Sequence, residues 1–203
     1  MGMATFAELV ADVKTLTNRP DLDAEIKLAV KAATLKAHQT DYYPQDIFET
    51  AIQWAPVAYQ QSLDYRLLIP RWRSFKFLRK YTPGVSPADD VDGIFFTVID
   101  PDRSLDSYGI NKENVCYLAG EQIEIRSTTE DEYMILGCYI HPDITEATYA
   151  SWIAVAHPFA IVYEATSKIF KTTGYDEQAT QMNKEVVEQY TILRNNNILM
   201  QGY

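Results

Sequence analysis

Cysteine and histidine are scarce in this sequence, and their scarcity limits the chemistry available. Two cysteines and three histidines occur in 203 residues, which excludes a disulfide-rich scaffold and argues against a zinc site. His38, His141 and His157 do not have the spacing of a metal-binding helix face. Cys116 and Cys138 lie among apolar residues of apparent strands. Two buried free thiols in a reducing compartment are favoured, and pairing of the two remains the alternative.

Glycine is also infrequent, and the motifs that depend on it are missing. With eight glycines, the sequence has no G-x-S-x-G nucleophile turn and no glycine loop that could cradle phosphate. We therefore expect a protein that is not an enzyme and that has no cofactor. At 203 residues, 47% of them hydrophobic, the chain is long enough for one domain with a substantial core.

Basic residues are outnumbered by acidic ones, 18 to 28, giving a formal charge of -10 and a pI of about 4.7. Binding nucleic acid by phosphate neutralisation needs clustered Lys and Arg, so this balance argues against it. It suits a protein partner, or a surface past which DNA moves without sticking. The sequence also has no apolar run long enough for a bilayer and no signal-peptide pattern at its start. We expect a product made in the cytoplasm with no membrane partner.

The N-terminal part has the three- and four-residue spacing of amphipathic helices. Helices are predicted over 4–18 and 22–39, separated by a break that contains Pro20. The small residues of the second helix would allow close approach to another helix. The expected apolar stripes are Phe6, Leu9, Val10, Val13 and Leu16 in the first helix, and Ile26, Ala29, Val30, Ala33 and Ala37 in the second.

The C-terminal part is helical by the same criteria. A helix begins at Pro158 with His157 as its cap and ends at Gly174. Another begins at Asp176 and is expected to break at Asn195–Asn197. A short helix over 152–156 precedes both. The expected stripes are Phe159, Val162, Tyr163, Thr166, Ile169 and Phe170, then Ala179, Met182, Val186, Tyr190 and Leu193.

The middle of the chain alternates apolar and polar residues in short runs, the pattern of strands. The segment 71–81 fits a strand or a helix, and the strand is favoured. Pro142 ends the last strand because proline cannot donate to a ladder. The predicted strands are 48–54, 59–67, 71–81, 94–99 (buried), 115–119, 122–126 and 133–140, with loops over 82–90 and 100–112.

These patterns predict an α+β fold in a single domain, residues 1–203. Helices from the two ends, about 4–40 and 146–195, form a bundle because neither pair can bury its apolar faces alone. A β-rich insertion, about 46–142, lies between them in the sequence. Residues 196–203 form a C-terminal tail.

Three segments are candidates for binding. An acidic loop resembles a calcium site only loosely, because the EF-hand order fails and the closing Glu is absent, so a solvated loop is simpler. A basic run interleaved with aromatic residues suits a nucleic-acid strip or, as we favour, an interface with an acidic neighbour. The apolar tail either frays or docks into a partner groove, and both remain open. The residues concerned are Asp89, Asp90, Asp92, Asp100 and Asp102; Arg71, Arg73 and Arg79 within the run 66–81; and Ile198, Leu199, Met200 and Tyr203.

Spaced residues along most of the chain, with 82–113 unmatched, resemble the head-to-tail adaptor (connector) proteins of tailed bacteriophages. The N-terminal part contributes Phe6-x-x-Leu9, Arg19-Pro20-Asp21-Leu22, and Ala33-Thr34-Leu35-x-x-His38-x-x-Asp41-Tyr42-Tyr43-x-x-Asp46-Ile47. The C-terminal part contributes Ala119-Gly120-x-x-Ile123-x-Ile125-Arg126, Gly137-Cys138-Tyr139-x-x-Pro142, Ser151-Trp152-Ile153, Pro158-x-Ala160-Ile161-x-Tyr163-x-Ala165, and Ile169-Phe170-x-x-x-Gly174-x-x-Glu177-x-Ala179. The family has no catalytic motif, so no individual contact residue is carried over.

This resemblance implies a structural protein of the virion neck. It implies a ring, expected to be dodecameric, bound beneath the portal protein and offering its other face to tail or nozzle proteins. DNA would pass through the lumen without specific binding, and the apolar tail would reach the portal. A tail-tube or tail-completion subunit is the alternative in the same class, and a small metal- or ligand-binding protein is the alternative in another.

Overall fold

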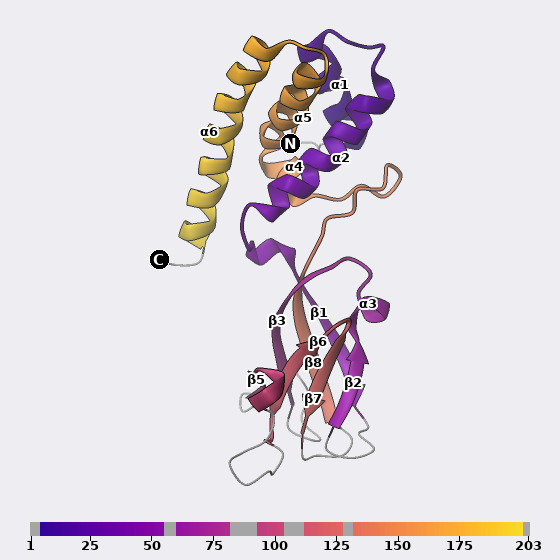
Figure 1. Ribbon diagram of the computed structural model, residues 1–203, viewed down its shortest axis with the longest axis vertical. Coiled ribbons are helices and arrows are strands. Elements are labelled where there is room, and N and C mark those ends of the chain that lie inside the picture. Colours follow the sequence, from indigo (N-terminus) through magenta and orange to yellow (C-terminus); the bar gives the residue numbers. More distant parts are fainter. Residues whose placement is uncertain (1–4, 55–59, 82–92, 104–111, 128–131, 201–203) are drawn as a thin grey trace. The chain divides into compact units, whose positions relative to one another are not determined.

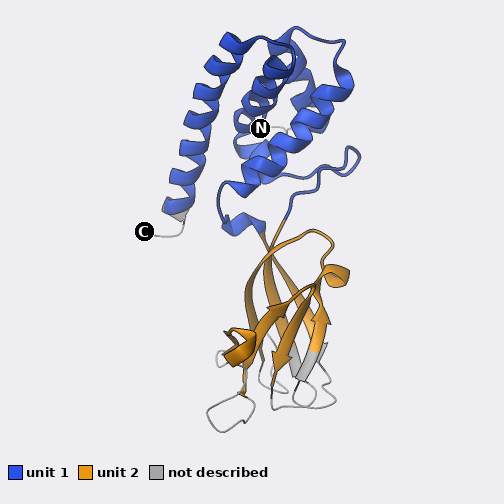
Figure 2. Cartoon of the chain, in the orientation of Figure 1, with its two compact units in different colours: residues 1–46, 141–203 blue, residues 47–140 orange. Residues whose placement is uncertain are grey.

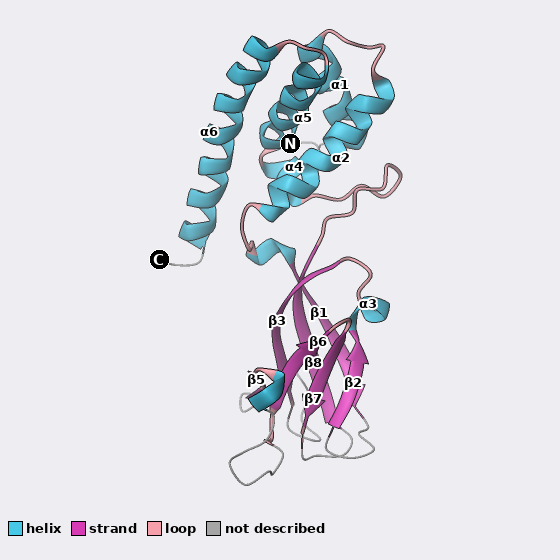
Figure 3. Ribbon diagram, viewed as in Figure 1, coloured by secondary structure: helices cyan, strands magenta, loops and turns pink. Residues whose placement is uncertain are grey.

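The computed structural model describes residues 5–54, 60–81, 93–103, 112–127 and 132–200. It divides the chain into two compact units (Figure 2). The helical unit comprises residues 1–46 and 141–203, and the β unit comprises residues 47–140. The predicted α+β class is confirmed: helices come from both ends of the chain, and the strands lie between them in the sequence (Figure 3).

The helical unit is arranged around α5, on which the other four longer helical segments pack (Figure 1). Local sequence fixes several helix ends. Thr5 and Glu8 form a reciprocal capping box at the start of α1, Pro158 occupies the first turn of α5, and Gly174, at φ +80°, ends α5 in the left-handed region. The helices are α1 (Phe6–Thr17), α2 (Asp23–Gln39), α4 (Trp152–Ala156), α5 (Pro158–Thr172) and α6 (Asp176–Met200), with a 3-10 turn η1 (Pro44–Asp46).

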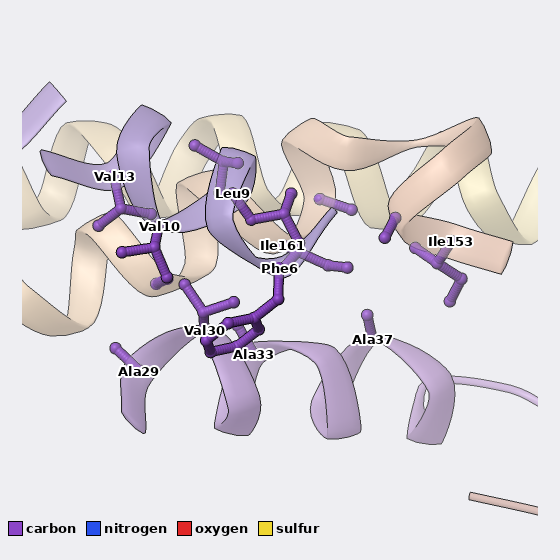
Figure 4. Close-up of a cluster of buried hydrophobic side chains, with 14 of the residues drawn as sticks. Phe6, Leu9, Val10, Val13, Ala29, Val30, Ala33, Ala37, Ile153 and Ile161 are labelled. Carbon is purple, nitrogen blue, oxygen red and sulfur yellow. The ribbon is translucent and has the colours of Figure 1, made fainter. Parts of the chain in front are cut away.

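The core of the helical unit joins the two ends of the chain. In Figure 4, Phe6 of α1 lies beside Val30 of α2, and Leu9 of α1 lies beside Ile161 of α5. Alanines on the inner stripe of α2 keep that helix close to its neighbours. All five residues predicted for the stripe of α2 are buried. The bundle therefore needs both ends of the chain to complete it.

Three predictions in this unit are wrong. Leu16 and Phe159 are 45% and 51% exposed, because each lies at the edge of its stripe, and Thr17 is buried in place of Leu16. His157 is the N-cap residue of α5, as predicted, although its side chain makes no cap hydrogen bond. Asn195–Asn197 do not break α6, which continues to Met200; the buried Asn197 side chain donates to Asp41 over 2.9 Å, which outweighs its low helix propensity.

The β unit consists of two four-stranded sheets (Figure 3). One has the order β1-β8-β3-β4, and the other has the order β2-β7-β6-β5. All pairs are antiparallel except β5 with β6. The elements are β1 (Ile47–Trp54), β2 (Gln60–Asp64), α3 (Tyr65–Leu68), β3 (Trp72–Lys80), β4 (Ile94–Phe95), β5 (Thr97–Val98), η2 (Pro101–Arg103), β6 (Val115–Ala119), β7 (Gln122–Arg126) and β8 (Glu132–Ile140).

The core of the β unit collects the inward residues of both sheets. Leu78, Ile123 and Leu136 are fully buried. Cys116 and Cys138 are both buried and free, as the favoured interpretation predicted. Their burial raises the pKa of Cys116 to about 12 and that of Cys138 to about 11. The thiols are therefore protonated and unreactive in the folded chain.

Two strand predictions need correction. The strand predicted over 59–67 ends at Asp64, whose carboxylate accepts the backbone N–H groups of Arg66 and Leu67 and so begins the short helix α3. The strand predicted over 94–99 is two short strands, β4 and β5, that join different sheets. Only Phe96 between them is buried, because its N–H donates to the carbonyl of Leu78.

Candidate partner-binding surfaces

A chain of buried polar groups lies where η1 meets α4 in the helical unit. His38 Nδ1 is 2.7 Å from Asp46 Oδ1, and His38 Nε2 is 2.8 Å from Ser151 Oγ. Trp152 Nε1 also donates to Asp46 Oδ1 over 2.8 Å. Ser151 Oγ accepts the N–H of Ala154 as the cap of α4. The network ties the end of α2 to the residues on either side of the β unit in the sequence.

The hydrogen-bonded order Asp46–His38–Ser151 is that of a hydrolase triad. His38 and Asp46 are 1% and 4% exposed, and Ser151 is 8% exposed. Its hydroxyl oxygen already accepts the N–H that caps α4. A nucleophile must be reachable by substrate and free to attack. The network is therefore a structural support, one that sequence reasoning missed because position 151 lies more than a hundred residues from the other two.

A pocket of about 310 Å³ lies beside this network, within the helical unit. It has the size of a site for one large side chain or a small ligand. The ring of Trp152 forms part of it and meets Tyr43 edge-on, with centroids 5.1 Å apart. Burial lowers the pKa of His157, so this wall is neutral at pH 7. The lining residues are Tyr43, Gln45, Trp152, Ala156, His157, Leu193, Asn196 and Asn197.

The end of α6 forms one wall of the pocket and carries the predicted apolar ending. Polar contacts hold it: Asn197 donates to Asp41, Asn196 Nδ2 is 3.4 Å from His157 Nε2, and Arg194 reaches the carbonyl of Thr40. Ile198 is 50% exposed on the helix. Leu199 and Met200 are also helical, so residues 196–200, predicted as part of a tail, belong to α6. Tyr203 lies outside the described residues.

The basic run falls on β3 and the residue before it. Trp72 and Phe75 pack on the core, while β-bulges at Arg73 and Lys76 interrupt the register with β8. Arg71 is exposed and Arg73 is half-buried. The guanidinium of Arg79 lies 5.1 Å from the Tyr81 ring centroid and 5.5 Å from that of Phe95, and the ammonium of Lys76 lies 5.5 Å from the Tyr139 centroid. The strand thus presents cations over aromatic rings.

The acidic loop is only partly within the described residues. Asp100 and Asp102 are exposed near η2, whereas Asp89, Asp90 and Asp92 lie outside the described ranges. Within those ranges, no three His, Cys, Asp or Glu side chains are grouped so that they could hold a metal ion. None of the described helices is long and apolar enough to cross a membrane.

No protein-family model matches this chain, and no characterised protein matches it.

Proposed function

We propose that this protein is a head-to-tail adaptor of a tailed bacteriophage, a structural component of the virion neck. The observation that carries the proposal is the topology. The family resemblance implies a helical bundle from both chain ends with a β-rich insertion, and the chain folds as a helical unit from 1–46 and 141–203 with the β unit between them in sequence. The agreement between the implied and the observed topology supports the proposal.

The end of α6 and the adjacent pocket supply the surface for the portal protein. Ile198 is exposed near the end of α6, and residues of the preceding turn, among them Leu193, line the pocket together with Trp152. Exposed apolar residues next to an apolar pocket suit a protein interface. In a ring, expected to be dodecameric, many copies of this contact act together. Each contact can therefore be weak while the complex of ring and portal is stable.

The remaining surfaces fit the same role. The formal charge of -10 disfavours adhesion of DNA to a channel wall, which allows the genome to pass through the ring. Tail or nozzle proteins would bind the face away from the portal. The protein would be made in the host cytoplasm and retained in the neck.

The decisive measurement is the mass of the purified protein, alone and with the portal protein of the same genome. A defined complex of ring on portal is expected. Absence of association at micromolar concentration would reject the proposal. If the protein bound a ring of another neck protein instead, it would be a tail-completion subunit.

A pair of substitutions in the helical unit tests which surface is used. Ile198→Asp places a charge at the proposed contact and is expected to weaken portal binding at least about tenfold, because desolvating an unpaired carboxylate is costly. Leu28→Asp is the matched control: it changes an exposed apolar residue of α2 in the same unit, 69% exposed, and is expected to leave binding unchanged. Equal effects of the two substitutions would contradict this assignment.

A further inference from the structure

The helical unit pairs most of the charges on its first two helices but not those on its last. Lys31 meets Glu146 over 3.0 Å, and Lys36 meets the buried Glu164 over 2.8 Å. On α6, by contrast, none of the four carboxylates forms an ion pair with any residue that the structure describes. Lys184 is the one cation between Asp176 and Glu188, and Arg194 follows nearer the end of the helix. These carboxylates belong to Asp176, Glu177, Glu185 and Glu188.

The outward side of α6 concentrates this acidity. Ala179, Val186 and Leu193 form the narrow stripe that faces α5, and Glu177 and Glu188 lie opposite to it at 100° per residue. Both are exposed. They are three helical turns apart, about 16 Å along the axis. We name Glu177, Glu185 and Glu188 the acidic face.

The outward side of β3 has the opposite sign. Arg71 and Lys76 are exposed, and neither forms an ion pair with a carboxylate in the described ranges. Five residues of strand span about 16 Å, somewhat less here because of the bulges. Phe95, 59% exposed, lies on the neighbouring strand of the same sheet. We name Arg71, Lys76 and Phe95 the basic face.

We propose that the acidic face of one copy binds the basic face of the next copy. The two faces have opposite charge and similar spacing between their outer charges, and each includes exposed apolar surface, Val187 at 65% and Phe95 at 59%. A contact between two different faces of one chain is heterologous, so it repeats head to tail and closes into a ring if the rotation allows. The inference rests on the proposed function, since it supplies the lateral contact of that ring.

A second copy fits the basic face better than nucleic acid does. Glu49 of β1 is exposed, and it is paired with Gly137 of β8. Side chains alternate between the two faces of a sheet, and the next pair along, Thr50 with Leu136, faces the core. Glu49 therefore lies on the outward side, as the basic face does. A carboxylate there interrupts the row of cations that a continuous phosphate backbone would need. A second copy needs only the two exposed cations, Arg71 and Lys76, opposite Glu177 and Glu188 of its acidic face.

Two charge-reversed variants test the contact by sedimentation of the protein alone at low salt. In the first, Arg71→Glu and Lys76→Glu reverse the basic face; in the second, Glu177→Lys and Glu188→Lys reverse the acidic face. Each variant is expected to self-associate about tenfold or more weakly than the unaltered protein, because attraction becomes repulsion. A 1:1 mixture of the two variants is expected to regain association. Every contact around the ring then again joins one positive and one negative face, because contacts between two unreversed faces alternate with contacts between two reversed faces.

Controls with equal charge change separate this contact from net charge. Lys112→Glu with Lys171→Glu matches the first variant, and Asp12→Lys with Glu25→Lys matches the second; both are expected to associate as the unaltered protein does. Association should also weaken from about 0.01 M to 1 M salt, as the screening length falls from about 30 to 3 Å.

The contrary outcomes are distinct. A protein that stays monomeric at low salt, or variants that the mixture fails to restore, would overturn the proposal; the latter result would indicate a contact within one chain. Loss of single-stranded DNA binding in the first variant, with self-association intact, would assign the basic face to nucleic acid instead. Portal binding measured on the same samples is the separate readout: if it persists while the mixture fails, the adaptor function stands and only this lateral contact is wrong.

Discussion

The helical unit and the β unit use the same charges in different ways. Each contains 14 acidic and nine basic residues, a formal charge of -5. The helical unit is discontinuous in sequence, and ion pairs such as Lys31–Glu146 join its two parts. The β unit is continuous, and six of its nine cations lie within residues 66–80. In the helical unit, ion pairs hold the two parts of the chain together, whereas in the β unit most of the cations gather on one surface.

The largest effects are expected from truncating one buried core side chain, in one unit at a time. Ile161→Ala in the helical unit and Ile123→Ala in the β unit each remove a fully buried side chain and should cost about 3 kcal/mol in the free energy of unfolding of that unit. Helical circular dichroism reports on the first unit, and labelling of Cys116 and Cys138 reports on the second. We expect each substitution to shift mainly its own probe. Equal shifts of both probes would mean that the units unfold as one.

Removing the buried carboxylate of Asp46 in the helical unit is expected to be nearly as costly. Asp46→Ala takes from His38 and Trp152 the acceptor that both contact, so the free energy of unfolding should fall by about 3 kcal/mol. Trp152 fluorescence during denaturation measures the change. Asp12→Ala, an exposed carboxylate without an ion pair in the described residues, should change stability by less than about 0.5 kcal/mol. Similar effects would show that the network contributes little.

The stability of the two units is expected to fall at different alkaline pH values, because different groups titrate in each unit. Burial raises the pKa of Cys138 to about 11 and that of Cys116 to about 12, above the ordinary 9.0. The unfolded thiols therefore lose protons first, and stability of the β unit, complete below pH 9, declines as pH rises toward 11 to 12. Burial also raises the pKa of Tyr43, Tyr149 and Tyr190 above the ordinary 10.0. The stability of the helical unit should therefore begin to decline about one pH unit above the pH at which that of the β unit does.

Thermal unfolding between pH 8 and 11, followed by helical circular dichroism for the helical unit and by the sheet band of the amide I infrared spectrum for the β unit, measures this order. Replacing both cysteines by alanine should flatten the pH dependence of the β unit while leaving that of the helical unit unchanged. A helical unit that weakened first would contradict the assignment of the thiols.

The smallest effects are expected at two glycines that play the same part in different units. Gly174 ends α5 at φ +80°, and Gly120 lies in the β6–β7 turn at φ +62°. A Cβ at either would meet no atom within 4 Å, so substitution by alanine tests backbone conformation alone. Each should cost about 1 kcal/mol, measured by chemical denaturation. A much larger cost at either position would reveal an unseen packing constraint.

The sequence predicts the helical unit well where one face of a helix decides its burial. The stripe of α2 and the turn at Gly174 follow from local spacing and from glycine's access to positive φ. The errors fall where a distant partner decides. Asn197 continues α6 because Asp41 accepts its amide hydrogen bond, and His38 belongs to a network closed by Ser151. Neither partner is visible from local pattern.

In the β unit, the existence of most strands is predictable but their pairing is not. The alternation in β1, β3 and β8 indicates strands, yet nothing local specifies that β8 lies between the other two. The residues 94–99 read as one buried strand, but Phe96 alone turns inward and the segment divides between two sheets. The candidate surfaces were predicted as residue types; which charges lack partners depends on the fold.

The chain enters the β unit on β1 and leaves it on β8, and these strands are paired neighbours, with Ile47 opposite Tyr139. Seen from the helices, the 94 residues from 47 to 140 are therefore equivalent to one hairpin tip, whose two stems stand about 5 Å apart. Any segment with ends at that spacing can be grafted there without altering the bundle. Replacement of the whole β unit is the simplest route by which related proteins would acquire new contacts while keeping the helical unit.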